Sequence, residues 1–271
     1  MPTRPLSLLL AAALACAAAL FHWPGHTSAP FADTAPTRQP VLVELFTSEG
    51  CSSCPPADSN LAHLSINQPL NGIEVIALEE HVDYWNGQGW SDPFSSPDFS
   101  RRQEDYATVI HGGGVYTPQM IVDGRTQLIG SRTQEAHDQI RWAAASRHPR
   151  LLLTPVPSPE AQTRTFELRL DPATPSSTSS SLDLWIAVTE KNLHSDVTGG
   201  ENSGHTLQHA PVVRLLRKQH TLSLPLTAPV TFTVGLNRGW LPDNLTVVAF
   251  LAQPKSHQVE ASGSVSLSQS M

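Results

Sequence analysis

Two cysteines three residues apart, Cys51 and Cys54, are the residues of this chain whose types and spacing point most directly to chemistry. They come soon after the apolar run 41–46, and Pro55 then opens a segment that we expect to be a helix. Two thiols at such a strand-to-helix turn can close a small disulfide ring that opens again readily. The pattern therefore predicts redox chemistry or the binding of a soft metal ion.

The helix start assigns different roles to the two thiols. Free N–H groups and the helix dipole stabilise a thiolate there, so Cys51 is predicted to be the attacking nucleophile. Cys54 lies further into the helix and is predicted to resolve a mixed disulfide. An inert local disulfide, Cys51–Cys54, is the alternative. A bridge across three residues cannot tie distant segments together, so we favour reactivity over a structural role.

Residues 1–29 have the features of a signal peptide or an N-terminal anchor. Arg4 precedes the apolar stretch 6–21, which is short for a membrane span of about 20 residues. Cys16 lies inside this segment, so two of the 3 cysteines belong to the mature chain. We expect a periplasmic or secreted protein, or one anchored to the inner membrane by this segment. A Pro-containing linker over residues 30–39 follows.

The charge of the chain excludes one class of partner. The 271 residues carry a formal net charge of -7, and no cluster of Lys and Arg is present to neutralise phosphates. We therefore expect no nucleic-acid partner. The expected partners are protein thiols or disulfides outside the cytoplasm, and contact with a membrane is expected only through the N-terminal segment.

Residues 40–149 predict an α/β domain. Strands are expected at 41–46 and 73–78, and helices are expected from residue 55 and at 98–110 and 131–146. Asp123 and Gly124 separate two short apolar runs, which predicts a hairpin. From residue 150 to 271 the chain changes to period-two apolar alternation, as at 166–170, 182–186, 230–234 and 245–251. That pattern predicts a second, mostly β, sandwich-like domain.

The strand, CxxC and helix order resembles the thioredoxin-like superfamily. The resemblance extends to Thr117 and Pro118, which precede the predicted hairpin. It implies a cis-proline facing the cysteine pair: Pro118 would keep a backbone edge beside Cys51 for a substrate chain, and Thr117 would tune the thiols.

More closely, the chain resembles the DUF1223 family, exported bacterial proteins of unassigned function with a thioredoxin-like domain. That resemblance implies this fold and an oxidoreductase-like site, without an established substrate. The motifs that carry it are the segments 43–58, 81–86, 89–97, 102–103, 116–120 and 200–204.

Further polar and aromatic residues are candidates for the site. Glu44 interrupts an apolar strand and is expected either to relay protons to Cys54 or to bind a neighbouring arginine. Glu49, His205 and His209 are expected to be solvated. The aromatic residues Tyr84, Trp85 and Trp90 are expected to line a substrate groove, or else to pack their loop down.

Three hypotheses follow for the function. The first is a thiol-disulfide oxidoreductase that uses Cys51 and Cys54 and needs no cofactor. The second is the binding or delivery of copper or zinc through Cys51, Cys54 and His81. The third is a non-catalytic interaction protein in which the Cys51–Cys54 disulfide is structural.

Overall fold

Strands predominate in the part of the chain that the structure describes. This computed structural model describes residues 38–146, 149–158, 160, 162–171 and 181–269, which contain thirteen strands and three α-helices. The expected N-terminal signal or anchor, 1–29, and most of the linker, 30–39, lie outside the described residues. Among those described, no helix is both long and apolar enough to cross a membrane.

The elements expected between residues 41 and 146 are present in the expected order. Asp123 and Gly124 form the turn of the hairpin with φ of 47° and 62°, the conformation for which an Asp-Gly pair is suited. The elements are β1 (Gln39–Thr47), α1 (Pro55–Asn67), β2 (Ile73–His81), α2 (Pro97–Val109), β3 (Gln119–Val122), β4 (Thr126–Ile129) and α3 (Thr133–Ala145).

The second half is built from strands, as its period-two pattern predicts. It contains a three-stranded sheet in the order β11-β6-β5 and a separate β8–β9 ribbon. The strands are β5 (Leu151–Val156), β6 (Thr163–Leu170), β7 (Ser181–Glu190), β8 (His194–Val197), β9 (His205–Gln208), β10 (Val212–Ser223), β11 (Val230–Gly235), β12 (Leu245–Ala252) and β13 (Val259–Ser266), with short 3-10 helices at Pro242–Asn244 and Leu267–Gln269.

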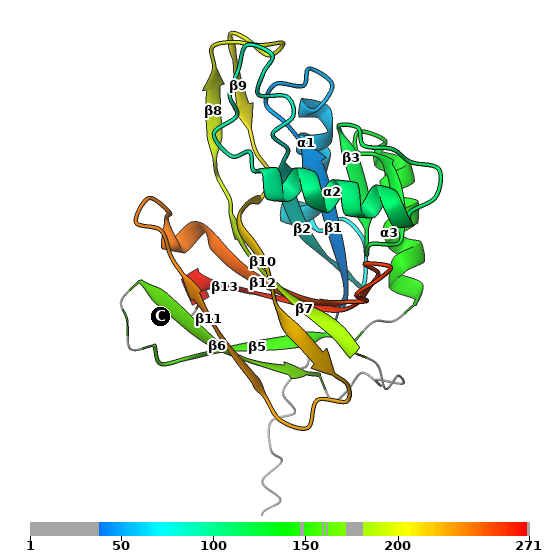
Figure 1. Ribbon diagram of the computed structural model, residues 1–271, viewed down its shortest axis with the longest axis vertical. Helices are drawn as coiled ribbons and strands as arrows, with labels where there is room; N and C mark the ends of the chain where they lie inside the picture. Colours follow the sequence, from blue (N-terminus) through cyan, green and yellow to red (C-terminus); the bar gives the residue numbers. More distant parts are fainter. Residues whose placement is uncertain (1–37, 147–148, 159, 161, 172–180, 270–271) are drawn as a thin grey trace, which may run out of the picture. The chain divides into compact units, whose positions relative to one another are not determined.

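A single mixed sheet of eight strands runs through both halves, in the order β13-β12-β7-β10-β2-β1-β3-β4 (Figure 1). The two halves meet where β10 pairs in parallel with β2, at Val212 and Glu79. The backbone N–H of Glu79 donates to the Pro211 carbonyl there, at 3.1 Å. This pairing gives β2 a neighbour on its second edge, so that its backbone groups are not left exposed.

The predicted fold class, an α/β thioredoxin-like domain followed by a β-sandwich-like domain, is therefore wrong. The sheet of the first half continues into β10, β7, β12 and β13 of the second half, and most of the regular structure is β. The sequence analysis identified no strand at Val212–Ser223. Its pairing with β7 is interrupted by irregularities between Val213 and Leu215 and between Lys218 and His220, which break the period-two signal.

The strand β1 presents alternate residues to two differently covered faces of the sheet. Val41, Val43 and Leu45 pack with α1 and α3, whereas Leu42 and Phe46 pack on the side of α2. Figure 1 shows α2 in front of β1 and β2, with α1 and α3 behind. The CxxC segment connects β1 to α1 and therefore belongs to the α1 side.

A buried ionic cluster lies on the α2 side. Glu44 Oε1 accepts from Arg102 Nε at 2.5 Å, and Glu44 Oε2 accepts from the Tyr106 hydroxyl at 2.5 Å. The Arg102 guanidinium also lies over the Trp185 ring, 4.7 Å from its centroid, and over Phe250 at 5.3 Å. Arg102 thus neutralises a buried acid of β1 and packs against β7 and β12, which joins the two halves.

Replacing Arg102 with methionine should strongly destabilise the protein. The change keeps most of the side-chain volume but leaves the buried Glu44 carboxylate without its cation, which costs about 3–5 kcal/mol. The free energy of unfolding, measured by urea titration with tryptophan fluorescence, should fall by that amount.

Arg101→Met is the matched control. Arg101 pairs with Asp98 on the exposed face of the same helix, so its loss should change the stability by no more than about 0.5 kcal/mol. Equal effects of the two substitutions would show that the buried pair does not hold the halves together.

Candidate functional site

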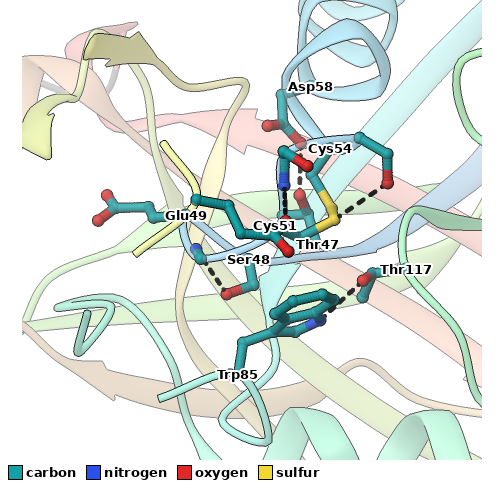
Figure 2. Close-up of a disulfide and its surroundings, with 12 residues drawn as sticks. Thr47, Ser48, Glu49, Cys51, Cys54, Asp58, Trp85 and Thr117 are labelled. Carbon is teal, nitrogen blue, oxygen red and sulfur yellow. Dashed lines mark hydrogen bonds between the residues drawn. A yellow bond between two sulfur atoms is a disulfide. The ribbon is translucent and has the colours of Figure 1, made fainter. Parts of the chain in front are cut away.

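Cys51 and Cys54 form a disulfide at the start of α1 (Figure 2). Their Cα atoms are 5.4 Å apart, and the Cys54 N–H donates to the Cys51 carbonyl at 3.1 Å. Cys54 is the N-cap residue of α1. Ser52 and Ser53 are exposed, but both cysteines are completely buried. The predicted pairing is confirmed, and the disulfide is covered by neighbouring segments.

Two polar side chains accompany the disulfide on the α1 side. The Ser53 hydroxyl lies 3.3 Å from Cys51 Sγ. Asp58 lies four residues after Cys54 on the same side of α1, and its carboxyl accepts from the Thr47 hydroxyl at 2.6 Å. Burial and the nearby Glu79 carboxylate raise the pKa of Asp58 well above its usual value. Asp58 is thus a buried acid beside the pair, and its i,i+4 spacing from Cys54 is the sequence signal that could have identified it.

Glu44 does not lie beside the cysteines. Its side chain is on the α2 side of the sheet, where it binds Arg102 and Tyr106. The sequence analysis kept two roles open for Glu44, and the structure places it with a neighbouring arginine. The buried acid that lies near the cysteines is Asp58.

The predicted Thr117 and Pro118 lie on the same side as the disulfide. The Thr117–Pro118 peptide is cis. The indole N–H of Trp85 donates to the Thr117 hydroxyl at 2.9 Å, and a Cβ added at Gly50 would lie 3.2 Å from Trp85 Cβ. Trp85 therefore sits between the cysteine loop and Thr117, as Figure 2 shows.

The other predicted aromatic residues have different environments. The Trp90 indole N–H donates to Glu49 Oε2 at 2.7 Å, the Trp90 ring lies against Gly199, and Trp90 Cβ lies against Gly200. Tyr84 is partly exposed, and its hydroxyl donates to Gln103 at 3.1 Å. Trp90 thus packs two loops together, and Tyr84 is the most exposed member of the predicted groove.

The connection between β8 and β9, residues 198–204, binds directly to the cysteine loop. The buried Asn202 side chain donates to the Glu49 carbonyl at 2.8 Å and to the Cys51 carbonyl at 3.0 Å. The Glu201 carboxylate accepts from the Ser52 N–H at 2.9 Å. The sequence analysis recognised this segment as a motif without a role. Its role here is to hold the backbone around Cys51.

Beneath this loop lies a buried group of acids and histidines. His81 Nδ1 is 2.7 Å from Asp92 Oδ2, and His209 Nε2 is 3.1 Å from Glu49 Oε1. Glu79 Oε1 lies 3.9 Å from a nitrogen of each histidine. The expectation that Glu49 and His209 are solvated is wrong. The β8–β9 ribbon brings His209 back against the sheet, a long-range contact that no local sequence signal reports.

The electrostatics of this group favour cationic imidazoles. Burial alone would lower the pKa of His81, but the carboxylates of Asp92 and Glu79 raise it well above its usual value. Burial likewise opposes the charge on His209, but Glu49 and Glu79 raise its pKa to about 9. The acids thus favour the protonated, positively charged forms of both imidazoles.

Of Cys51, Cys54 and His81, the residues predicted to bind copper or zinc, His81 belongs to this buried group of acids and histidines. Its ring nitrogens face Asp92 and Glu79, and Phe94 and His209 contact its ring. The sulfurs of Cys51 and Cys54 are bonded to each other. The three residues are therefore not arranged as a ligand set in the disulfide form.

One solved structure that is similar to this chain shows its fold. An X-ray structure of a protein from Agrobacterium tumefaciens has a TM-score of 0.63 at 24% identity, covering 85% of this chain and 95% of that one. A domain of the outer membrane lipoprotein Omp28 from Porphyromonas gingivalis has a TM-score of 0.28 at 11% identity, covering 42% of this chain and 85% of that one. A hypothetical protein from Pyrococcus horikoshii has a TM-score of 0.22 at 14% identity, covering 43% of this chain and 84% of that one. Both are too distant to support an argument.

A search among curated proteins finds no match. The model of the family described as "Protein of unknown function (DUF1223)" matches residues 42–252. The match includes the CxxC segment, the Thr117–Pro118 segment and the 198–204 connection, and it spans both halves of the eight-stranded sheet. The chain therefore belongs to the DUF1223 family.

Proposed function

We propose that this protein is a thiol-disulfide oxidoreductase acting outside the cytoplasm. The observation that supports it is the Cys51–Cys54 disulfide at the start of α1, with Asp58 beside it. The proposed compartment depends on the export segment at the N-terminus.

The reaction exchanges two electrons between the cysteine pair and a partner protein. In the reduced protein, the Cys51 thiolate attacks a partner disulfide and releases one partner thiol. Cys54 then attacks the sulfur of Cys51 in the mixed disulfide, which releases the second partner thiol and closes the Cys51–Cys54 bond. The same steps in reverse oxidise a partner dithiol. The reduction potential of the pair relative to its partner decides the direction.

A reactive role fits the small ring better than a structural one. The chain-entropy model gives a disulfide that closes a loop of this size about 2 kcal/mol of stabilisation, against about 3 kcal/mol for a 15-residue loop. Cys51 and Cys54 are separated by three positions inside a turn that backbone hydrogen bonds already define. The disulfide therefore adds little that the turn lacks.

The surroundings favour thiolate chemistry once the pair is reduced. The positive end of the α1 dipole and the Ser53 hydroxyl can stabilise a sulfur anion. Asp58, with its raised pKa, can exchange a proton with the neighbouring thiol. Asp58 thereby takes the relay role that the sequence analysis considered for Glu44.

Access to the disulfide requires movement of the 198–204 connection. Both cysteines are buried, and Asn202 and Glu201 bind the backbone on either side of Cys51. We infer that a partner cysteine reaches Cys51 Sγ when this connection moves aside. Its hydrogen bonds thus control how often the pair is available.

An equilibrium titration against glutathione should show a reversible two-electron couple. We expect a potential between about -120 and -300 mV, the range that redox enzymes and labile disulfides occupy. Cys54→Ser should accumulate mixed disulfides with partner proteins through Cys51, because the resolving thiol is gone. Cys51→Ser is the matched control and should trap none. A pair that stays oxidised throughout this range, together with an empty trap, would favour the structural disulfide of a non-catalytic interaction protein.

Asn202→Ala should speed up reduction of the disulfide by dithiothreitol. The substitution removes the side-chain donor of the buried Glu49 carbonyl and one of the two donors of the Cys51 carbonyl, which costs about 1–3 kcal/mol in the closed state. We expect the reduction rate, followed by thiol labelling, to rise about tenfold, because a tenfold change in the opening equilibrium corresponds to about 1.4 kcal/mol.

Ser203→Ala serves as the control from the same connection, since Ser203 is exposed and its hydrogen bond to the Gly200 carbonyl uses the backbone N–H. An unchanged rate in Asn202→Ala would mean that this connection does not limit access.

A further inference from the structure

Three side chains converge on one buried point beneath the cysteine loop. Glu79 and His81 are two residues apart on β2 and therefore project from the same face of the sheet. His209 reaches them from the segment between β9 and β10. One potential ligand atom from each residue lies within 4.8 Å of those of the other two, and the three side chains are at most 1% exposed.

Each imidazole has a carboxylate beside one of its ring nitrogens. His81 Nδ1 forms a hydrogen bond with Asp92, and His209 Nε2 lies 3.1 Å from Glu49 Oε1 and forms a hydrogen bond with the Ser195 hydroxyl at 3.4 Å. Their other nitrogens, His81 Nε2 and His209 Nδ1, face Glu79. A carboxylate behind the imidazole is the usual support of a metal-binding histidine, because it fixes the tautomer and turns the free nitrogen towards the ion.

The atoms at the centre of this group lack hydrogen bonds. Among the described residues, His81 Nε2, His209 Nδ1 and both carboxylate oxygens of Glu79 have no hydrogen-bond partner. The 3.9 Å from Glu79 Oε1 to each of these nitrogens is too long for a hydrogen bond. It leaves space for an ion between them. With bonds of about 2.0–2.2 Å to nitrogen and oxygen, zinc would draw the three groups slightly closer.

The net charge of the buried group also favours a bound cation. Three carboxylates, those of Glu49, Glu79 and Asp92, are buried around the two histidines. Within the described part of the chain, the ion-pair partners of Glu49, Glu79 and Asp92 are histidines alone. With neutral imidazoles the group is strongly negative, which is costly in a buried site. A divalent cation removes that excess.

We propose that Glu79, His81 and His209 bind one zinc ion. Two imidazoles and one carboxylate form a ligand set suited to zinc, and the borderline-soft nitrogen donors disfavour magnesium and calcium. Glu79 can bind through one or both oxygens, since both lack other partners. The Phe94 ring packs against both imidazoles, with centroids 5.4 Å and 5.1 Å away, and shields the site from water.

This site differs from the Cys51, Cys54 and His81 set expected from the sequence. It shares His81 but uses no sulfur, so it is complete while the disulfide is intact. It is also independent of the proposed redox reaction, and its test does not depend on oxidoreductase activity.

Zinc binding to the oxidised full chain tests the proposal. After removal of metal by a chelator, the wild type should bind one zinc ion per chain in competition with a chromophoric chelator. Zinc should also raise the melting temperature. His209→Ala should lower the affinity at least about 100-fold, and Asp92→Asn should lower it about 10–100-fold through the supporting carboxylate. His205→Ala, which removes a histidine four residues away, should leave the affinity unchanged.

Cobalt substitution and a cysteine-free variant identify the ligands. Cobalt(II) should give visible d–d bands without the sulfur-to-cobalt charge-transfer band that cysteine ligands would add. The Cys51→Ser/Cys54→Ser variant should keep its zinc affinity. Circular dichroism checks that each variant folds. If His209→Ala does not fold, the zinc affinity of Asp92→Asn tests the site in its place.

Specific results would overturn the proposal. A wild-type chain that takes up no zinc would mean that protonated histidines alone balance the buried acids. Equal affinities of the His209→Ala and His205→Ala variants would exclude His209 as a ligand. Loss of zinc from the cysteine-free variant would assign the ion to the thiols.

Discussion

The pairing of β2 with β10 is the interaction on which both the fold and the candidate sites depend. The Glu79 N–H donates to the Pro211 carbonyl, and Val212 pairs with Glu79. One backbone contact thereby fuses the strands of the two halves into one sheet. It also fixes His209, two residues before Pro211, beside the side chains of Glu79 and His81. Sheets with parallel strands place sites at the carboxyl ends of those strands, and here a segment from the second half completes the site.

Buried acids on the two faces of β1 and β2 are paired with different basic residues. On the α2 side, Arg102 provides a permanent cation for Glu44 and lies 3.8 Å from Glu80, whose pKa is raised well above its usual value by burial and by Glu44. On the α1 side, the acids face two histidines. Arginine keeps its charge at any relevant pH, whereas histidine can exchange a proton for a metal ion. The second face is therefore the one equipped to bind and release a cation.

Local patterns were sufficient to predict much of the first half. The continuous apolar run of β1, the proline start of α1 and the Asp123–Gly124 turn each depend on neighbouring residues alone, and each is present as expected. The same holds for the Cys51–Cys54 disulfide, whose partners are three positions apart. Each of these features is determined by residues that are close together in the sequence.

The features that sequence reasoning missed are those set by long-range contacts. Irregular pairing hides the period of β10, and without β10 nothing indicates that β2 has a second neighbour. The burial of Glu49 and His209 depends in turn on that connection. Asp58 was missed for a different reason: it lies near Cys54 because the two residues are four positions apart on one face of α1.

The β8–β9 ribbon links the disulfide to the buried acids and histidines. Its turn residue Asn202 binds the carbonyls of Glu49 and Cys51, and His209, directly after β9, contacts the Glu49 side chain. Glu49, two residues before the disulfide, is thus contacted at its backbone and at its carboxylate by the same part of the chain. The chemistry of the cysteine pair therefore belongs to the whole eight-stranded unit, because a fragment ending near residue 149 would retain both cysteines but lose Asn202 and His209.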